Sequence, residues 1–347
     1  MGKGIKKIVI DVAKIVLPLG VGVYLTWYLF SSMDIATKTI FYDAIKHANY
    51  FWIFLALIFA LASHVLRAYR WRFMLEPLGV KPNFWHRYHA VMIGYLMNLL
   101  IPRAGEASRA AMLYRTDRIP FAKSFGTIIA ERVFDVAMTG IIFLFAITVS
   151  MEDLLSIKET VIKNSTRVEG ETGNGILFII GGVFLLGLFM LIIFWLKSPT
   201  FKEKIIQFVR GMFNGIFSIF KSKHPFQFLF YTLLIWLFYL INFSLCFKAF
   251  EQTQDFPLEG ILVGFIAGTF GVAFTNGGIG AYPYLVGIVV MYFIGAQYDS
   301  KEMVEGIGKA LGMIIWSSQT ILLIILGIIS LIFLPRNYNK EQDEKMG

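Results

Sequence analysis

A charged segment, residues 98–110, interrupts one of the long apolar stretches of this 347-residue sequence. Its Arg103, Glu106 and Arg109 are spaced three residues apart, so they share one face if a helix starts near Gly105. Backbone that leaves a helix at membrane depth is tolerated only where protein or a water-filled cavity covers it, and ionisable groups there usually mark a site. We therefore predict a site at this break. The alternative is a cytoplasmic loop that lies outside the membrane.

Two further charged clusters can meet this break. Arg67 and Arg70 end an apolar stretch and lie three apart, on one helix face. Glu131 and Asp135 lie four apart in a later apolar stretch and share a face, whereas Arg132 points elsewhere unless it snorkels to the interface. The arginines can also be read as ordinary positive charge at the inner end of a span. For the carboxylates, pairing with the arginines of the break and a role in transport are both open.

Together the clusters predict a pocket with several guanidinium groups and a few carboxylates near the inner leaflet. A guanidinium fork suits phosphate oxygens, so a phosphate-bearing lipid head group is the expected ligand class. We expect no cofactor and no metal ion. Cys246 is the single cysteine, and His86 and His89 have no neighbouring cluster that would complete a metal site.

A second break lacks charge. It contains Gly277, Gly278 and Gly280, which permit backbone conformations that other residues rarely adopt. Pro283 can begin a half-helix there, and free amides at a helix N-terminus attract anions. The alternative is that the small residues of this region serve tight helix packing.

The elements that must position these residues are membrane-spanning helices. The sequence is 57% hydrophobic and 16% charged, whereas a soluble domain carries about 25% charged residues. The net charge of +9 does not indicate nucleic-acid binding, because its distribution over the loops fits membrane topology better. We expect an all-α polytopic membrane protein with six full spans and two re-entrant or broken helical hairpins. The predicted spans are 8–30, 50–68, 122–148, 175–196, 226–248 and 307–334, and the predicted hairpins are 84–118 and 259–295.

Loop charges predict the orientation. The four loops 1–7, 67–87, 103–123 and 197–225 are all positive, whereas the loops on the other side are neutral or negative. Under the positive-inside rule, both termini are then cytoplasmic and each hairpin returns to its own side.

The same assignment predicts an inverted repeat within one integral membrane domain, 1–347. Residues 1–148 form the first half and residues 175–334 run through the same series upside down. An extracytoplasmic loop, 150–174, joins the two halves. A cytoplasmic amphipathic linker, 197–225, lies within the second half. In many transporters with such repeats, the site lies at the paired broken segments.

The motifs resemble those of the lysylphosphatidylglycerol synthase transmembrane-region family. The resemblance rests on four segments in order, 66–72, 98–109, 131–135 and 277–280, and covers nearly the whole chain. It implies a lipid flippase that moves phospholipid from the inner to the outer leaflet, while a separate soluble domain performs aminoacyl transfer. The stretch after the last predicted span is too short for that domain, so synthase activity is not expected.

The expectation is therefore a transporter-like protein of the bacterial cytoplasmic (inner) membrane, which moves a phosphate-bearing phospholipid or polyprenyl-linked lipid between leaflets. The alternatives are a membrane-embedded transferase or hydrolase on lipid-linked substrates, and a non-catalytic partner of a lipid-modifying enzyme. Membrane lipids are the expected partners, and a homodimer and a separate lipid-modifying enzyme stay open. The residues expected to bind substrate are Arg67, Arg70, Asn98, Arg103, Glu106, Arg109, Glu131, Arg132, Asp135, Gly277, Gly278 and Gly280.

Overall fold

The computed structural model describes residues 19–167, 224–295 and 297–334, and this part of the chain is helical without a strand. In chain order, the elements are an apolar helix Leu19–Ser31, α2 (Ile35–His47), α3 (Tyr50–Arg70), α4 (Arg72–Leu75), η1 (Glu76–Leu78), α5 (Phe84–Leu100), α6 (Ala104–Asp117), α7 (Phe121–Arg167), α10 (Pro225–Phe247), η2 (Glu251–Thr253), α11 (Leu258–Phe274), η3 (Asn276–Gly278), α12 (Ala281–Gly295) and α13 (Lys301–Phe333). The predicted all-helical fold class is confirmed. The predicted span 175–196 and most of the linker 197–225 lie outside the described residues.

Four stretches of the described chain are long and apolar enough to cross a membrane. They are Tyr50–Leu78, Phe121–Val149, Pro225–Phe247 and Lys301–Phe333. Each matches one predicted span, because about 20 apolar residues at ~1.5 Å rise per residue cross the hydrocarbon core. The number of six full spans stays a prediction.

The helix α7 corrects one predicted boundary. The sequence predicts a loop over 150–174, but α7 continues without interruption as far as Arg167. The polar composition of this stretch does not end the helix, because it contains neither proline nor glycine before that point. A polar helix end therefore follows the apolar span directly.

The first predicted hairpin, 84–118, consists of two helices that fold back on each other, α5 and α6. They are separated by a short break in which Arg103 has a left-handed backbone (φ 61°). The close approach of the two helices requires glycine at two facing positions. A Cβ added at Gly105 would collide with the backbone oxygen of Gly94 and with the Asn98 amide.

The second predicted hairpin, 259–295, consists of α11 and α12 joined by η3. Gly277, Gly278 and Gly280 all have positive φ, between 61° and 79°. Only glycine adopts such conformations without strain, so the glycines allow the chain to reverse here.

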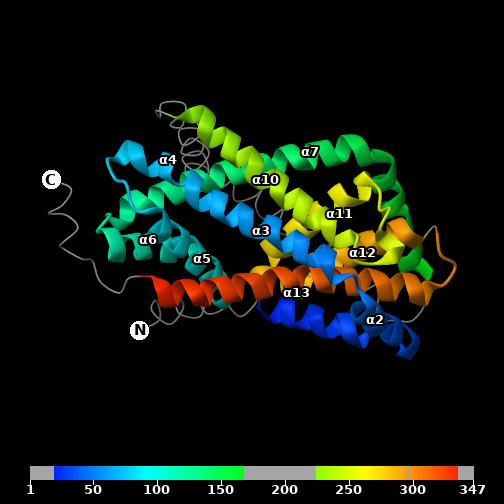
Figure 1. Cartoon of the computed structure of the whole chain (residues 1–347). Helices are drawn as coiled ribbons and strands as arrows, with labels where there is room; N and C mark the ends of the chain where they lie inside the picture. The colour runs from blue at the N-terminus through cyan, green and yellow to red at the C-terminus, as the bar shows by residue number, and fades with distance from the viewer. Residues whose placement is uncertain (1–18, 168–223, 296, 335–347) are drawn as a thin grey trace, which may run out of the picture.

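The long helices pack in a regular pattern around these hairpins (Figure 1). Helix α13, drawn in red, packs against α12 and α5, whereas α7 packs against α6 and α11. Helices α3 and α10 pack along each other. Helices α7 and α13 thus each contact one helix of both hairpins, and the hairpins themselves lie within the bundle.

Candidate functional site

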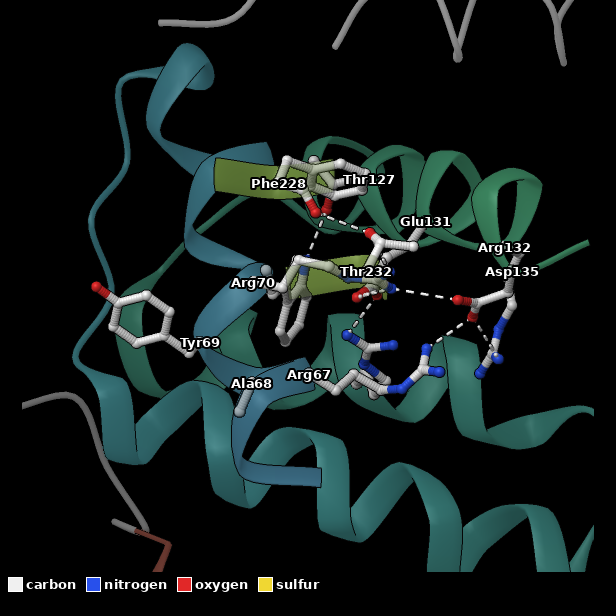
Figure 2. A network of polar contacts seen from close by, with 12 residues as sticks. Arg67, Ala68, Tyr69, Arg70, Thr127, Glu131, Arg132, Asp135, Phe228 and Thr232 are labelled. Carbon is white, nitrogen blue, oxygen red and sulfur yellow. Dashed lines mark hydrogen bonds and ion pairs between the residues drawn. The ribbon is translucent and has the colours of Figure 1, made fainter. Parts of the chain in front are cut away.

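Two arginines at the end of α3 bind two carboxylates of α7 inside the helix bundle (Figure 2). Arg67 contacts Asp135 at 2.7 Å, and Arg70 contacts Glu131 at 2.9 Å and Asp135 at 3.3 Å. The spacing of three between the arginines and of four between the carboxylates puts each pair on one helix face. The predicted shared face of Glu131 and Asp135 is therefore present, and both carboxylates point at α3.

A third arginine reaches one of these carboxylates, Glu131, from the first hairpin. Arg109 of α6 donates to the second oxygen of Glu131 at 2.9 Å, and its guanidinium lies 4.2 Å from the centre of the Trp71 ring. The Trp71 indole in turn donates to the Thr127 hydroxyl of α7 at 2.9 Å. The pairing of α7 carboxylates with an arginine of the charged break, one of the two roles left open by the sequence, is thus present.

Helix α10 completes the network with neutral groups. Thr232 accepts a hydrogen bond from Arg70 at 2.8 Å, and the Tyr239 hydroxyl accepts one from Arg67 at 3.2 Å. The ring of Phe228 lies 5.0 Å from the Arg70 guanidinium. We call Arg67, Arg70, Arg109, Glu131 and Asp135 the core network.

The core network is almost inaccessible. Arg70 and Glu131 have no exposed surface, and the most exposed member, Asp135, is 8% exposed. Breaking a buried ion pair by removing one partner typically costs 3–5 kcal/mol, because a buried charge is left uncompensated. These residues therefore connect α3, α6, α7 and α10 and are not an open pocket.

A second ion pair forms the accessible edge of this network. Arg132 contacts Glu106 of α6 at 3.0 Å and Asp135 at 3.4 Å, and its side chain is 34% exposed. Arg132 therefore points toward the other charges. The sequence analysis expected it to point elsewhere unless it snorkels to the interface. With this pair included, four guanidinium groups face three carboxylates, so the site carries one excess positive charge.

The arginine nitrogens are not all used. The Nε atoms of Arg67, Arg70, Arg109 and Arg132 are buried and make no hydrogen bond within the described part of the chain. Each guanidinium has five N–H donors. Four N–H donors of the site therefore have no protein acceptor among the described residues.

Arg103 lies apart from the network. It precedes α6 in the left-handed conformation, its side chain is exposed, and it makes no ion pair with a described residue. Arg103 therefore does not share the predicted face with Glu106 and Arg109, because its left-handed backbone (φ 61°) places it outside the helical path of α6. Asn98, in the last turn of α5, accepts a hydrogen bond from the Gly105 amide at 2.7 Å and so joins α5 to α6.

The glycines of the second break meet other residues. A Cβ added at Gly277 would meet Leu99, and one added at Gly280 would meet Gly22 and Thr26. Next to these glycines, Asn276 donates to the Leu99 carbonyl at 2.8 Å. The structure therefore joins the tips of the two hairpins. It does not bring the glycines to the core network.

Several residues of this region carry no signal that the sequence analysis used. They are Thr127, Thr232 and Tyr239. The spacing of seven between Thr232 and Tyr239, polar groups on one face of an otherwise apolar helix, could have indicated the contribution of α10.

The two histidines of α5 have separate polar partners: His86 contacts Asp117, and His89 contacts Ser330. The described residues contain no group of three or more potential metal ligands.

These helices and their buried charges define a multi-pass helical membrane protein. The chain belongs to the family described as the lysylphosphatidylglycerol synthase TM region, which it matches over residues 15–298. The family predicted from the four sequence motifs is therefore confirmed.

Two named proteins are similar to parts of the chain. The UPF0104 membrane protein MJ1595 of Methanocaldococcus jannaschii is 29% identical over 144 residues, which cover 34% of this chain and 43% of that protein. The glycosyltransferase AglD of Haloferax volcanii is 28% identical over 142 residues, which cover 36% of this chain and 23% of that protein. The chain thus matches less than half of the length of either relative. No solved structure matches the chain.

Proposed function

We propose that this protein moves a phosphate-bearing lipid, a phospholipid or a polyprenyl-linked lipid, between the leaflets of the cytoplasmic membrane. The observation that carries the proposal is the contact between the two hairpin tips, where Asn276 binds the Leu99 carbonyl at 2.8 Å. Broken helices that meet within the bundle are the usual place of the substrate site in transporters. Membership of a family named for the membrane region of a lipid-modifying enzyme supports a lipid as the substrate.

The packing pattern supports an inverted repeat as the basis of this movement. In the predicted repeat, α5 corresponds to α11 and α7 corresponds to α13. The contact of α13 with α5 should therefore have a counterpart in a contact of α7 with α11, and both contacts exist. The contact of α6 with α7 likewise corresponds to that of α12 with α13. In this proposal, each hairpin re-enters the membrane from its own side, with both termini in the cytoplasm.

The accessible positive charges provide the head-group site. Arg103 is exposed at the tip of the first hairpin, and Arg132 is partly exposed beside Glu106. A phosphate group approaching from the lipid would meet these two guanidinium groups first. The core network behind them holds the helices in place and supplies the excess positive charge. The acyl tails would stay in the surrounding lipid.

Reconstituted protein tests the proposal directly. Liposomes would carry fluorescent phospholipid or polyprenyl phosphate labelled on the head group, and a membrane-impermeant quencher would report movement between leaflets. Arg103→Gln should slow this movement about tenfold, equivalent to ~1.4 kcal/mol in the barrier. The matched control is Lys123→Gln, which removes an exposed cation from the start of α7. Both lipids staying in their leaflets with the wild-type protein would contradict the proposal.

One observation favours a second function, that of a transferase on a lipid-linked substrate. The relative AglD is named a glycosyltransferase. Among the three site carboxylates, Glu106 is the most accessible, with 21% of its side chain exposed, and it is therefore the candidate general base. Glu131 and Asp135 are held by two or more arginines each. Turnover of a lipid-linked substrate in detergent that is lost in Glu106→Gln would favour this enzyme over the flippase.

A further inference from the structure

A separate cavity lies where the chain turns from α3 into α5. It has a volume of 220 Å³ and is lined by Arg72, Glu76, Val80, Lys81, Pro82 and Arg87. None of these residues belongs to the core network or to the hairpin tips. At about 30 Å³ per water molecule, the cavity has room for a phosphate group and several waters, but not for a whole lipid. We call it the elbow pocket.

The elbow pocket is positively charged. Three of its residues are cationic, and the single carboxylate, Glu76, already pairs with Arg72 at 3.1 Å. Lys81 is exposed and has no ion-pair partner within the described chain. A net charge of +2 therefore faces a cavity of phosphate size.

Arg87 gives this pocket a built, buried donor. It is 6% exposed and is held from behind, because one terminal nitrogen donates to the carbonyls of Ala68 and Tyr69 at the end of α3. Its Nε is buried and has no hydrogen-bond partner among the described residues. A fixed guanidinium with an unused N–H is suited to bind an oxyanion, because hydrogen bonds between ionised groups are about twice as strong as those between neutral groups.

We propose that the elbow pocket binds a phosphate group, that of an anionic lipid head group or of a free phosphate monoester. The orientation in the proposed function puts this elbow at the cytoplasmic surface, and basic pockets between helices on that side bind anionic head groups. Trp85, 59% exposed in the first turn of α5, is of the type that anchors helices at the interface. The inference rests on the proposed orientation but does not require lipid transport.

The test measures equilibrium binding to the full chain in detergent micelles. The probe is phosphatidic acid with a fluorescent acyl chain, with phosphatidylcholine of the same tails as the control lipid. The double variant Arg72→Gln, Lys81→Gln leaves Arg87 and its contacts to α3 in place. The matched control is Lys46→Gln, which removes an exposed cation from α2.

We expect the double variant to bind phosphatidic acid about tenfold more weakly than the wild type, equivalent to ~1.4 kcal/mol, and Lys46→Gln to bind it unchanged. Equal binding by the double variant and the wild type would overturn the inference. Glycerol 3-phosphate distinguishes the sources: displacement of the probe by this compound at equal concentration identifies a free phosphate monoester as sufficient, whereas persistence of the probe identifies the lipid.

The result is separable from the proposed function. Wild-type protein that binds phosphatidic acid through these residues but moves no lipid in liposomes would overturn the flippase alone. If the protein moves lipid but the double variant binds phosphatidic acid as tightly as the wild type, this inference alone is overturned.

Discussion

The side chain of Asn276 donates a hydrogen bond of 2.8 Å to the backbone carbonyl of Leu99, and so joins two breaks that lie 177 residues apart in the chain. Leu99 is at the end of α5, where the last carbonyls have no partner within the helix. Trp316 of α13 donates to the Gly277 carbonyl at 2.9 Å and holds the second tip from the other side. The second hairpin thus satisfies a free backbone carbonyl of the first, and α13 satisfies one of the second.

This contact predicts that locking the tips together stops transport. A Cβ at Gly277 would lie 3.9 Å from the Leu99 Cα, which is close enough for a disulfide between cysteines at the two positions. Oxidation of the variant Leu99→Cys, Gly277→Cys should reduce lipid movement about tenfold or more, because transport by repeats requires one to move against the other. The reduced variant serves as its own control for the strain at position 277. Equal movement before and after oxidation would show that the tips need not separate.

The core network predicts strong coupling between Arg109 and Glu131. Each single change, Arg109→Gln or Glu131→Gln, should lower the free energy of unfolding by about 3 kcal/mol or more, because a buried charge loses its partner. The double variant should cost about 1–3 kcal/mol less than the sum of the two single variants, since residues in contact are not additive. Denaturant unfolding of the purified protein in detergent gives all three values.

A partly exposed arginine provides the control for this cycle. Arg72 pairs with Glu76 at the surface of the elbow, and its side chain is 38% exposed. Arg72→Gln should change stability by less than about 1 kcal/mol, since exposed pairs contribute little. A network variant that is no less stable than Arg72→Gln would contradict the structural role of the buried charges.

The sequence predicted the class of fold and the place of both breaks because these depend on local signals. Apolar length identifies a span, and a run such as Gly277-Gly278 identifies a break, without knowledge of any partner. The family followed from residue motifs of the same local kind. The partners of the charged residues were harder to predict, because they depend on which helices meet.

Arg67 and Arg103 illustrate that limit. Both are arginines at the end of an apolar stretch, but Arg67 is 3% exposed and bound to Asp135, whereas Arg103 is exposed and unpaired among the described residues. The difference comes from the backbone: Arg67 is still inside α3, and Arg103 precedes the first turn of α6. The continuation of α7 to Arg167 was also not predicted. The polar composition of this stretch was interpreted as a loop, but polar composition alone does not end a helix.

The contact between Gly105 and Gly94 predicts a site that tolerates no side chain. The backbone of α6 lies against α5 at this point, and a Cβ at Gly105 would overlap the Gly94 oxygen and the Asn98 amide. Gly105→Ala should therefore lower the free energy of unfolding by about 1–3 kcal/mol, the usual cost of overpacking. It should also slow lipid movement, because the displaced α6 carries Glu106 and Arg109.

Gly126 is the matched control for this change. It lies in α7, and a Cβ added there would meet no atom within 4 Å, so Gly126→Ala should leave stability unchanged or raise it by about 0.5–1 kcal/mol through helix propensity. Both variants add one methyl group to a helical glycine, so their difference reports the contact with α5 alone. Thermal unfolding in detergent measures it. If Gly105→Ala is as stable as Gly126→Ala, then α5 and α6 are not packed as closely in the folded protein, and the position of Arg109 against Glu131 would need another support.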